Sequence, residues 1–339
     1  MQTVQTLDYH TAGEPFRIVT GGVPTIPGDT ILVKREWAMR HLDHVRQLVV
    51  NEPRGHADMY GCFLTPPASA DAEIGVLFFH NAGFSTACGH GTIALVTAGL
   101  EIGMLRGVEI GPDERRVVVD VPSGRLEAVA RTEDGRVRSV RFRNVPAYVE
   151  TPSLTVDVSG VGEIDVAIAY GGAFYAILPV SATGHTVSPE HLSSLIALGR
   201  DIKSAVERRH VPVHPEGRSL RGIYGVIFTE SVTGADGKHA RHDRNVTIFA
   251  DGEVDRSPCG SGTSARLAHL FATGEVRLQQ KLVHESIIGT RFAGHVAAET
   301  TVASYPAVYT EIEGRAFRTG SHTFFLDPDD DLGTGFLLR

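Results

Sequence analysis

The chain contains two copies of one short motif, Cys88-Gly89-His90-Gly91-Thr92 and Cys259-Gly260-Ser261-Gly262-Thr263. Each copy leads directly into an apolar stretch that is predicted to be a helix. A cysteine at such a position lies close to the first-turn N–H groups and to the positive end of the helix dipole, which favour its thiolate. The glycines allow backbone amides to approach a bound anion closely. The repeat therefore predicts a duplicated fold in which two thiols act on one small acidic ligand.

Apolar residues recur at helical spacing after both motifs, which predicts one buried face on each helix. These positions are Ile93, Val96 and Leu100 after the first motif, and Leu267, Leu270 and Phe271 after the second. Further helices are predicted over residues 36–50 and 189–207, and strands over residues 76–79, 116–121 and 166–170. The expected architecture is an α/β (α+β) fold rich in strands. One domain is predicted over residues 1–163, joined by 320–339, and a second over residues 164–319.

The composition is that of an ordinary globular protein, with 42% apolar and 21% charged residues in 339. This length favours two domains. The net charge of −8 gives no attraction to nucleic acid or to an anionic membrane. The sequence contains no signal peptide pattern and no apolar run of transmembrane length, so a cytoplasmic protein is expected.

The three cysteines are few and odd in number, which favours reduced thiols over a disulfide framework. Cys62 lies in an alternating apolar run and is predicted to be a small buried hydrophobic residue. Cys88 and Cys259 are the candidate catalytic residues. One thiolate would remove the proton from Cα on one face of a substrate, and the opposing thiol would donate a proton on the other face. This scheme inverts the stereocentre and requires no metal and no organic cofactor.

Two further side chains lie near the thiols in sequence. Asp255 precedes Cys259 by four residues, where its carboxylate is placed to pair with a substrate ammonium; the alternative is that it caps a turn or helix. His90 follows Cys88 by two residues, where it is placed to hydrogen-bond the ligand or the thiol; the alternative is a solvent-facing loop histidine. His41 and His44 lack a second ligand pair and are predicted to lie on the surface rather than to bind a metal.

The polar stretch of residues 233–244 is predicted to be an exposed loop. A different class of function is also open at this point. A protein that binds an amino acid without reaction would use the two helix N-termini only to hold a carboxylate.

Five segments together resemble the proline racemase family, which includes hydroxyproline epimerases and trans-3-hydroxyproline dehydratases. The segments are His10-Thr11-Ala12-Gly13-Glu14-Pro15, Glu52-Pro53-Arg54-Gly55-His56-Ala57-Asp58-Met59, Cys88-Gly89-His90-Gly91, Gly171-Gly172-Ala173-Phe174 and Asp255-Arg256-Ser257-Pro258-Cys259-Gly260-Ser261-Gly262-Thr263. The resemblance covers residues 7–338. It implies a diaminopimelate-epimerase-like fold of two pseudo-symmetric domains, an active site in the cleft between them, and a homodimer.

The resemblance also implies a role for each matching position. The two acid/base thiols are Cys88 and Cys259, Asp255 meets the ring nitrogen of the substrate, and the residues that line the substrate are Gly89, His90, Gly260 and Ser261. The substrate class it implies is proline or a hydroxyproline.

One position departs from the branch of the family that the flanking segments resemble most. Those flanks are similar to trans-3-hydroxyproline dehydratases, which typically carry threonine where this chain has Cys259. A dehydratase needs one base at Cα and no proton donor on the opposite face, whereas racemisation needs two acid/base groups. The second thiol therefore favours a racemase or epimerase acting on proline or 4-hydroxyproline, with a trans-3-hydroxy-L-proline dehydratase that yields pyrroline-2-carboxylate as the alternative.

Overall fold

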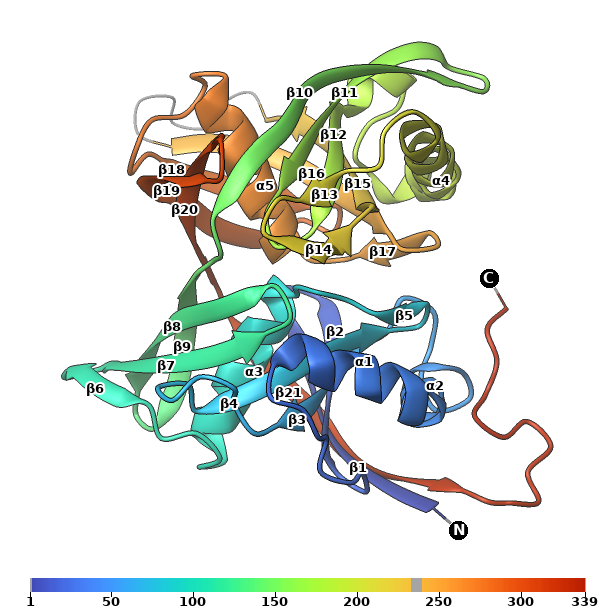
Figure 1. Cartoon of the computed structure of the whole chain (residues 1–339), viewed down its shortest axis with the longest axis vertical. Helices are drawn as coiled ribbons and strands as arrows, with labels where there is room; N and C mark the ends of the chain where they lie inside the picture. Colours follow the sequence, from blue (N-terminus) through green and yellow to red (C-terminus); the bar gives the residue numbers. More distant parts are fainter. Residues whose placement is uncertain (1, 233–239, 339) are drawn as a thin grey trace. The chain divides into compact units, whose positions relative to one another are not determined.

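A computed structural model describes residues 2–232 and 240–338 and divides the chain into two compact units (Figure 1). The first unit comprises Met1–Phe142 and Arg315–Arg339, and the second comprises Arg143–Gly314. The first boundary lies about twenty residues earlier than residue 163, the position predicted from sequence. The reason is that the strand after this boundary, β10 (Ala147–Val158), pairs with β11 (Gly162–Tyr170) and with β20 (Tyr305–Gly314) of the second unit. The second boundary lies at 314/315 rather than 319/320, where β21 begins.

In the described part of the first unit there are three helices, and every strand except β21 begins before residue 143. Its elements are β1 (Gln2–Thr11), β2 (Glu14–Gly21), α1 (Ile31–His41), α2 (Asp43–Val50), β3 (Tyr60–Thr65), β4 (Ile74–His80), β5 (Gly83–Phe84), α3 (Gly89–Glu101), β6 (Val108–Gly111), β7 (Glu114–Val121), β8 (Gly124–Glu133), β9 (Arg136–Arg143) and β21 (Ala316–Leu326).

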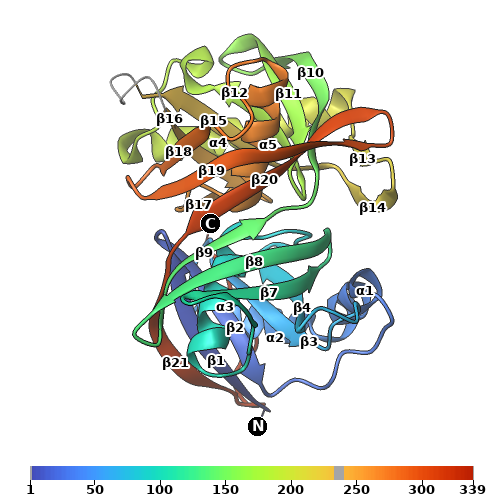
Figure 2. The same cartoon turned by 90° about the vertical axis from the view of Figure 1, so that its left-hand side faces the viewer.

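The sheet of this unit runs in the order β21-β1-β2-β3-β4-β7-β8. The C-terminal strand β21 lies antiparallel beside β1 along ten paired positions, as both views show (Figure 2). Helix α3 packs against β1, β2, β3, β8 and β21. Strands from several parts of the sheet thus cover this one helix.

The second unit carries the other elements. They are β10, β11, β12 (Phe174–Pro179), two 3₁₀ turns (Val180–Thr183 and Pro189–His191), α4 (Leu192–Arg209), β13 (Val213–His214), β14 (Gly217–Arg221), β15 (Ile223–Ser231), β16 (Ala240–Phe249), β17 (Glu253–Asp255), α5 (Gly260–Ala272), β18 (Lys281–Ser286), β19 (Arg291–Val302) and β20.

Eight strands of the second unit close into a ring, in the order β10-β11-β12-β15-β16-β18-β19-β20, because β20 pairs back to β10. Helix α5 contacts β11 and β12 as well as β19 and β20, which belong to different sides of this ring. It therefore fills the interior. Helix α4 packs outside, against β10, β15 and β16.

The structure buries more of the two motif helices than the sequence predicts. Eleven of the 13 residues of α3 and ten of the 13 residues of α5 are buried. The prediction of a single buried face is wrong, because strands surround each helix. Gly91 allows one such close approach, because a Cβ there would lie 2.4 Å from the ring of Phe16 in β2. A helix enclosed in this way holds its N-terminal cysteine in a fixed position.

Other local predictions have mixed outcomes. The three strands predicted from sequence are confirmed within β4, β7 and β11, and the helix predicted over residues 189–207 corresponds to α4. The helix predicted over residues 36–50 is wrong as a single element. The chain breaks at Leu42, whose side chain is 2% exposed, and Asp43 begins α2, with its carboxylate accepting hydrogen bonds from Arg46 and Gln47.

Residues 233–239 of the predicted polar loop lie outside the described residues. Residues 240–244 belong to β16, so the loop prediction is wrong for this part. Cys62 is fully buried in β3, as predicted, and burial raises the pKa of its thiol. Across the described ranges, no helix combines the length and apolar character needed to cross a membrane.

Candidate active site

Cys88 is the N-cap residue of α3. Its backbone is extended, with φ −154° and ψ 101°, and the amide of Gly91 donates a hydrogen bond to its Sγ at 3.2 Å. The amide and hydroxyl of Thr92 both donate to the Cys88 carbonyl, at 3.0 and 2.9 Å. The sulfur therefore takes the place that a serine or aspartate oxygen occupies at an ordinary helix N-cap. These hydrogen bonds within one helical turn explain the Gly91-Thr92 pair that follows Cys88 in the motif.

His90 contacts the same sulfur. Its Nε2 lies 3.3 Å from Cys88 Sγ, and the ring is packed edge-on against Phe16 and Tyr60. Burial lowers the pKa of His90 to about 3, so the imidazole is neutral at physiological pH. Thr11 donates a hydrogen bond to the His90 carbonyl at 2.9 Å. The alternative of a solvent-facing loop histidine is wrong, and the ring is a neutral hydrogen-bonding partner of the Cys88 sulfur.

Cys259 repeats this arrangement at the start of α5. Its Sγ accepts a hydrogen bond from the amide of Gly262 at 3.3 Å, and its carbonyl accepts one from the amide of Thr263 at 2.7 Å. Gly260 and Gly89 are the first residues of their helices. The two units therefore present chemically equivalent N-terminal turns, each with a buried thiol as the N-cap.

The backbone at Cys259 differs from that at Cys88. Its φ is +62° and its ψ is 108°, a region that residues with a side chain rarely adopt. The amide of Cys259 donates to Ser257 Oγ at 3.1 Å, and the amide and hydroxyl of Ser257 donate to Asp255 Oδ1 at 2.8 and 2.7 Å. Asn245 donates to the carbonyl of Pro258 at 2.9 Å. Such strain persists only where surrounding bonds hold it, and it is typical of functional sites.

Asp255 consequently performs the turn-forming role that the sequence left open as an alternative. Its side chain is buried, and burial raises its pKa to about 6 despite the hydrogen bonds from Ser257, which act in the opposite direction. At neutral pH this carboxylate is largely ionised, and it lies close to the second thiol.

Burial also dominates the ionisation of Cys259. It raises the pKa of the thiol to about 12, and the Asp255 charge acts in the same direction, whereas the hydrogen bonds from Gly262, Tyr175 and Ser261 favour the thiolate. The helix N-terminus by itself favours a thiolate, whereas burial favours the neutral thiol at Cys259, which is the form that the two-thiol scheme requires of its proton donor.

Tyr175 was not singled out from the sequence. This fully buried residue of β12 places its hydroxyl 2.7 Å from Ser261 Oγ and 3.8 Å from Cys259 Sγ. The only signal was its position directly after the glycine-rich segment at residues 171–174. Gly171 explains why that segment is rich in glycine: a Cβ there would lie 2.3 Å from the Ser261 carbonyl oxygen. The first turn of α5 is thus packed against this loop.

The predicted site residues fall into two groups. The first unit holds Cys88, Gly89 and His90, and the second unit holds Asp255, Cys259, Gly260 and Ser261. Among the described residues, no cluster of three or more histidine, cysteine, aspartate or glutamate side chains is arranged to hold a metal ion. Each group consists of a thiol, a helix N-terminus and buried hydrogen-bonding side chains. A helix N-terminus can bind a carboxylate, and a thiol can accept or donate a proton.

Comparison with known proteins identifies the family. The family model described as proline racemase matches residues 6–337. A trans-3-hydroxy-L-proline dehydratase of Bacillus thuringiensis subsp. konkukian is 47% identical over 333 residues, which are 98% of this chain and 97% of the relative. A 4-hydroxyproline 2-epimerase of Streptosporangium roseum is 44% identical over 332 residues, again 98% of this chain and 97% of the relative.

A solved structure is similar over the same length. The crystal structure of a hydroxyproline epimerase from Agrobacterium vitis, with bound trans-4-hydroxy-L-proline, has a TM-score of 0.91 and 34% identity, and the match covers 99% of this chain and 96% of that chain. The predicted sheet-rich α+β fold and the family resemblance are both confirmed. With a family match from residue 6 to residue 337 and relatives aligned along almost their whole length, this chain belongs to the proline racemase family of enzymes.

Proposed function

We propose that this enzyme is a cofactor-independent racemase or epimerase that inverts Cα of proline or 4-hydroxyproline. The observation that carries the proposal is the second thiol. Cys259 is the N-cap of α5 as Cys88 is of α3, and each sulfur accepts a hydrogen bond from the third amide of its helix. Threonine at this position would keep a capping oxygen but would lose the acid/base group. A reaction that needs only one base leaves this second thiol without a role.

The proposed reaction transfers one proton at each face of Cα. Cys88, as the thiolate, takes the α-proton, and the electron pair of the C–H bond moves onto the substrate carboxylate. Cys259 then donates its thiol proton to the opposite face and becomes the thiolate, so the reverse reaction begins from Cys259. The raised pKa of Cys259 supports its assignment as the donor in this direction. First-turn amides stabilise the charge that develops on the carboxylate.

Asp255 is proposed to receive the ammonium of the substrate ring. With its pKa raised to about 6, the carboxylate is protonated at lower pH and then no longer neutralises a cation. We expect kcat/KM to fall as the pH decreases through about 6, since this parameter reports ionisations of the free enzyme. The measurement is kcat/KM between pH 5 and pH 9, at constant ionic strength.

Two variants test whether this pH dependence arises from Asp255. Asp255→Asn is expected to lower kcat/KM by roughly a hundredfold and to remove the acidic limb. Asp251→Asn changes an exposed aspartate of the same segment and is expected to leave both the rate and the profile unchanged. An acidic limb that persists in Asp255→Asn would assign the ionisation to another group.

A second candidate function has support from the relatives. The 47% identical protein is named a trans-3-hydroxy-L-proline dehydratase. In that reaction Cys88 would remove the α-proton and the C–H electron pair would form the Cα–C3 double bond. The 3-hydroxyl would leave as water with the proton returned by the Cys88 thiol, which becomes a thiolate again. The product is pyrroline-2-carboxylate, and Cys259 is not needed as a base.

Proton NMR in D2O under reducing conditions distinguishes the two functions. Separate samples contain L-proline, trans-4-hydroxy-L-proline and trans-3-hydroxy-L-proline. Loss of the α-proton signal together with appearance of the other stereoisomer is the expected result, and it identifies the preferred ring. Conversion of the 3-hydroxy substrate alone to pyrroline-2-carboxylate would overturn the epimerase in favour of the dehydratase.

A further inference from the structure

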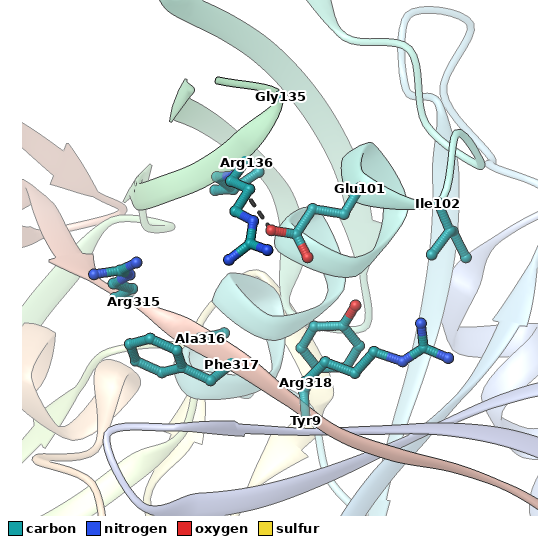
Figure 3. Close-up of a pocket in the computed structure, with 10 residues that line it drawn as sticks. Tyr9, Glu101, Ile102, Gly135, Arg136, Arg315, Ala316, Phe317 and Arg318 are labelled. Carbon is teal, nitrogen blue, oxygen red and sulfur yellow. Dashed lines mark hydrogen bonds between the residues drawn. The ribbon is translucent and has the colours of Figure 1, made fainter. Parts of the chain in front are cut away.

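An open pocket of about 490 Å³ lies within the first unit, at the C-terminal end of α3 (Figure 3). Glu101, the last residue of α3, forms one wall, the start of β9 around Arg136 forms a second, and the chain from Arg315 to Arg318 forms a third. Tyr9 of β1 completes it. Because α3 has 13 residues, this pocket lies about 20 Å from Cys88 at the opposite end of the helix. It is therefore separate from the first thiol.

The lining is strongly basic in a chain whose net charge is −8. Arg136, Arg315 and Arg318 line the pocket together with one carboxylate, that of Glu101, so the lining carries two net positive charges. Within residues 2–232 and 240–338, none of these three guanidinium groups forms an ion pair. Glu101 accepts a hydrogen bond from the amide of Val137 at 3.3 Å, and Arg315 lies over the ring of Phe317 at 4.6 Å. The charges of Arg136 and Arg318 are available to a ligand.

Tyr9 supplies an independent indication that something binds here. Its side chain is only 1% exposed, yet its hydroxyl has no hydrogen-bond partner among the described residues. Tyr9 is the register partner of Arg318, so both side chains project from the same face of the β1–β21 pair. Figure 3 shows the hydroxyl turned toward the space between Glu101 and Arg318. Buried hydroxyl groups almost always have a partner, and an oxygen of a ligand would provide one.

We propose that this pocket binds a small dianion that also carries a hydroxyl group, such as a hydroxy-dicarboxylate or a phosphate ester. The two net positive charges match a dianion, and guanidinium groups bind carboxylates and phosphates through paired hydrogen bonds. The Tyr9 hydroxyl donates to an anionic oxygen, and Glu101 accepts from the ligand hydroxyl. The proposal does not depend on which reaction the thiols catalyse.

The position of the pocket connects it to the catalytic helix at two points. Glu101 ends α3, and Tyr9 lies two residues before Thr11, which holds the carbonyl of His90. A ligand bound to Glu101, Tyr9 and Arg318 would restrict the motion of the C-terminal end of α3 and of β1. Its occupancy is therefore expected to stabilise the first unit against unfolding.

Calorimetric titration of the whole protein with L-malate, and separately with glycerol 3-phosphate, tests the proposal at ionic strength held constant with sodium chloride. At least one of the two is expected to bind saturably with a Kd below about 1 mM. Binding of malate alone identifies a dicarboxylate site, binding of glycerol 3-phosphate alone identifies a phosphate-ester site, and binding of both supports the shared chemistry. Absence of saturable heat with both compounds would overturn the proposal.

Variants assign any binding to this pocket. The double variant Arg136→Gln/Arg318→Gln is expected to raise Kd at least about tenfold, whereas Arg218→Gln, at an exposed arginine of the second unit, leaves Kd unchanged. Tyr9→Phe is expected to raise Kd several-fold while its melting temperature without ligand stays the same or increases, because an unpartnered buried hydroxyl is removed. A double arginine variant that binds like the wild type would place the ligand elsewhere.

Discussion

Replacement of Cys88 by serine is expected to lower turnover of every substrate by at least about a thousandfold. Both candidate reactions begin with removal of the α-proton by Cys88, and a serine hydroxyl is a far weaker acid than a thiol, so it supplies almost no anionic base at neutral pH. Serine is among the best N-cap residues, and its oxygen replaces the sulfur that accepts from Gly91. The fold is therefore expected to remain intact.

The measurement is exchange of the α-proton of the L stereoisomers in D2O, since the reverse reaction begins from Cys259, together with a thermal melt that verifies folding. Cys62→Ala is the matched control, because this variant removes a buried thiol from β3, outside the site residues. It is expected to lose some stability through the small cavity and to retain its turnover. Residual exchange within tenfold of the wild type in Cys88→Ser would remove Cys88 from the role of base.

Replacement of Cys259 by serine is expected to separate proton exchange from inversion. Cys88 can still remove the α-proton and return a solvent deuteron to the same face, while donation to the opposite face is lost. Inversion is expected to fall by roughly a thousandfold, with exchange of one stereoisomer retained. Proton NMR records exchange, and chiral chromatography of the same samples records inversion.

The same variant tests the dehydratase directly. Elimination from trans-3-hydroxy-L-proline needs no donor on the opposite face, so a dehydratase would keep its rate within a few-fold in Cys259→Ser. Serine is preferred to threonine for this experiment because φ at this position is +62°, where a β-branched side chain adds steric strain. Full inversion by Cys259→Ser would contradict the two-thiol mechanism.

Local patterns in the sequence predicted the two motif helices and the cysteine at the start of each. The reason is that N-capping joins residues only three positions apart, as the bonds from Gly91 to Cys88 and from Gly262 to Cys259 show. The strands at β4, β7 and β11 were equally readable from short apolar runs. The break at Leu42 was not, because helical spacing of apolar residues continues through it, although the backbone at Leu42 leaves the helical conformation, with φ −121° and ψ 7°.

The neighbours of the thiols depend on contacts that are distant in sequence. Tyr175 approaches Ser261 across 86 positions, and Thr11 bonds to His90 across 79. The spacing of residues along the sequence cannot predict these contacts, because they form only when the strands have paired. The role of Asp255 was ambiguous for a related reason: its carboxylate is close to Cys259 in sequence, but only the backbone conformation shows that Ser257 links the two.

The sequence by itself determined the fold family, the pair of thiols and the chemistry open to them, since these reside in residue types and in bonds within one helical turn. Only the tertiary structure decided how those groups ionise. A helix N-terminus alone favours a thiolate, but strands that are remote in sequence enclose α5 and remove water from Cys259, which raises the pKa of its thiol to about 12. The desolvation free energy of a buried Cys259 thiolate exceeds its favourable interaction with the first-turn amide dipoles. This desolvation occurs only when the strands have assembled around α5.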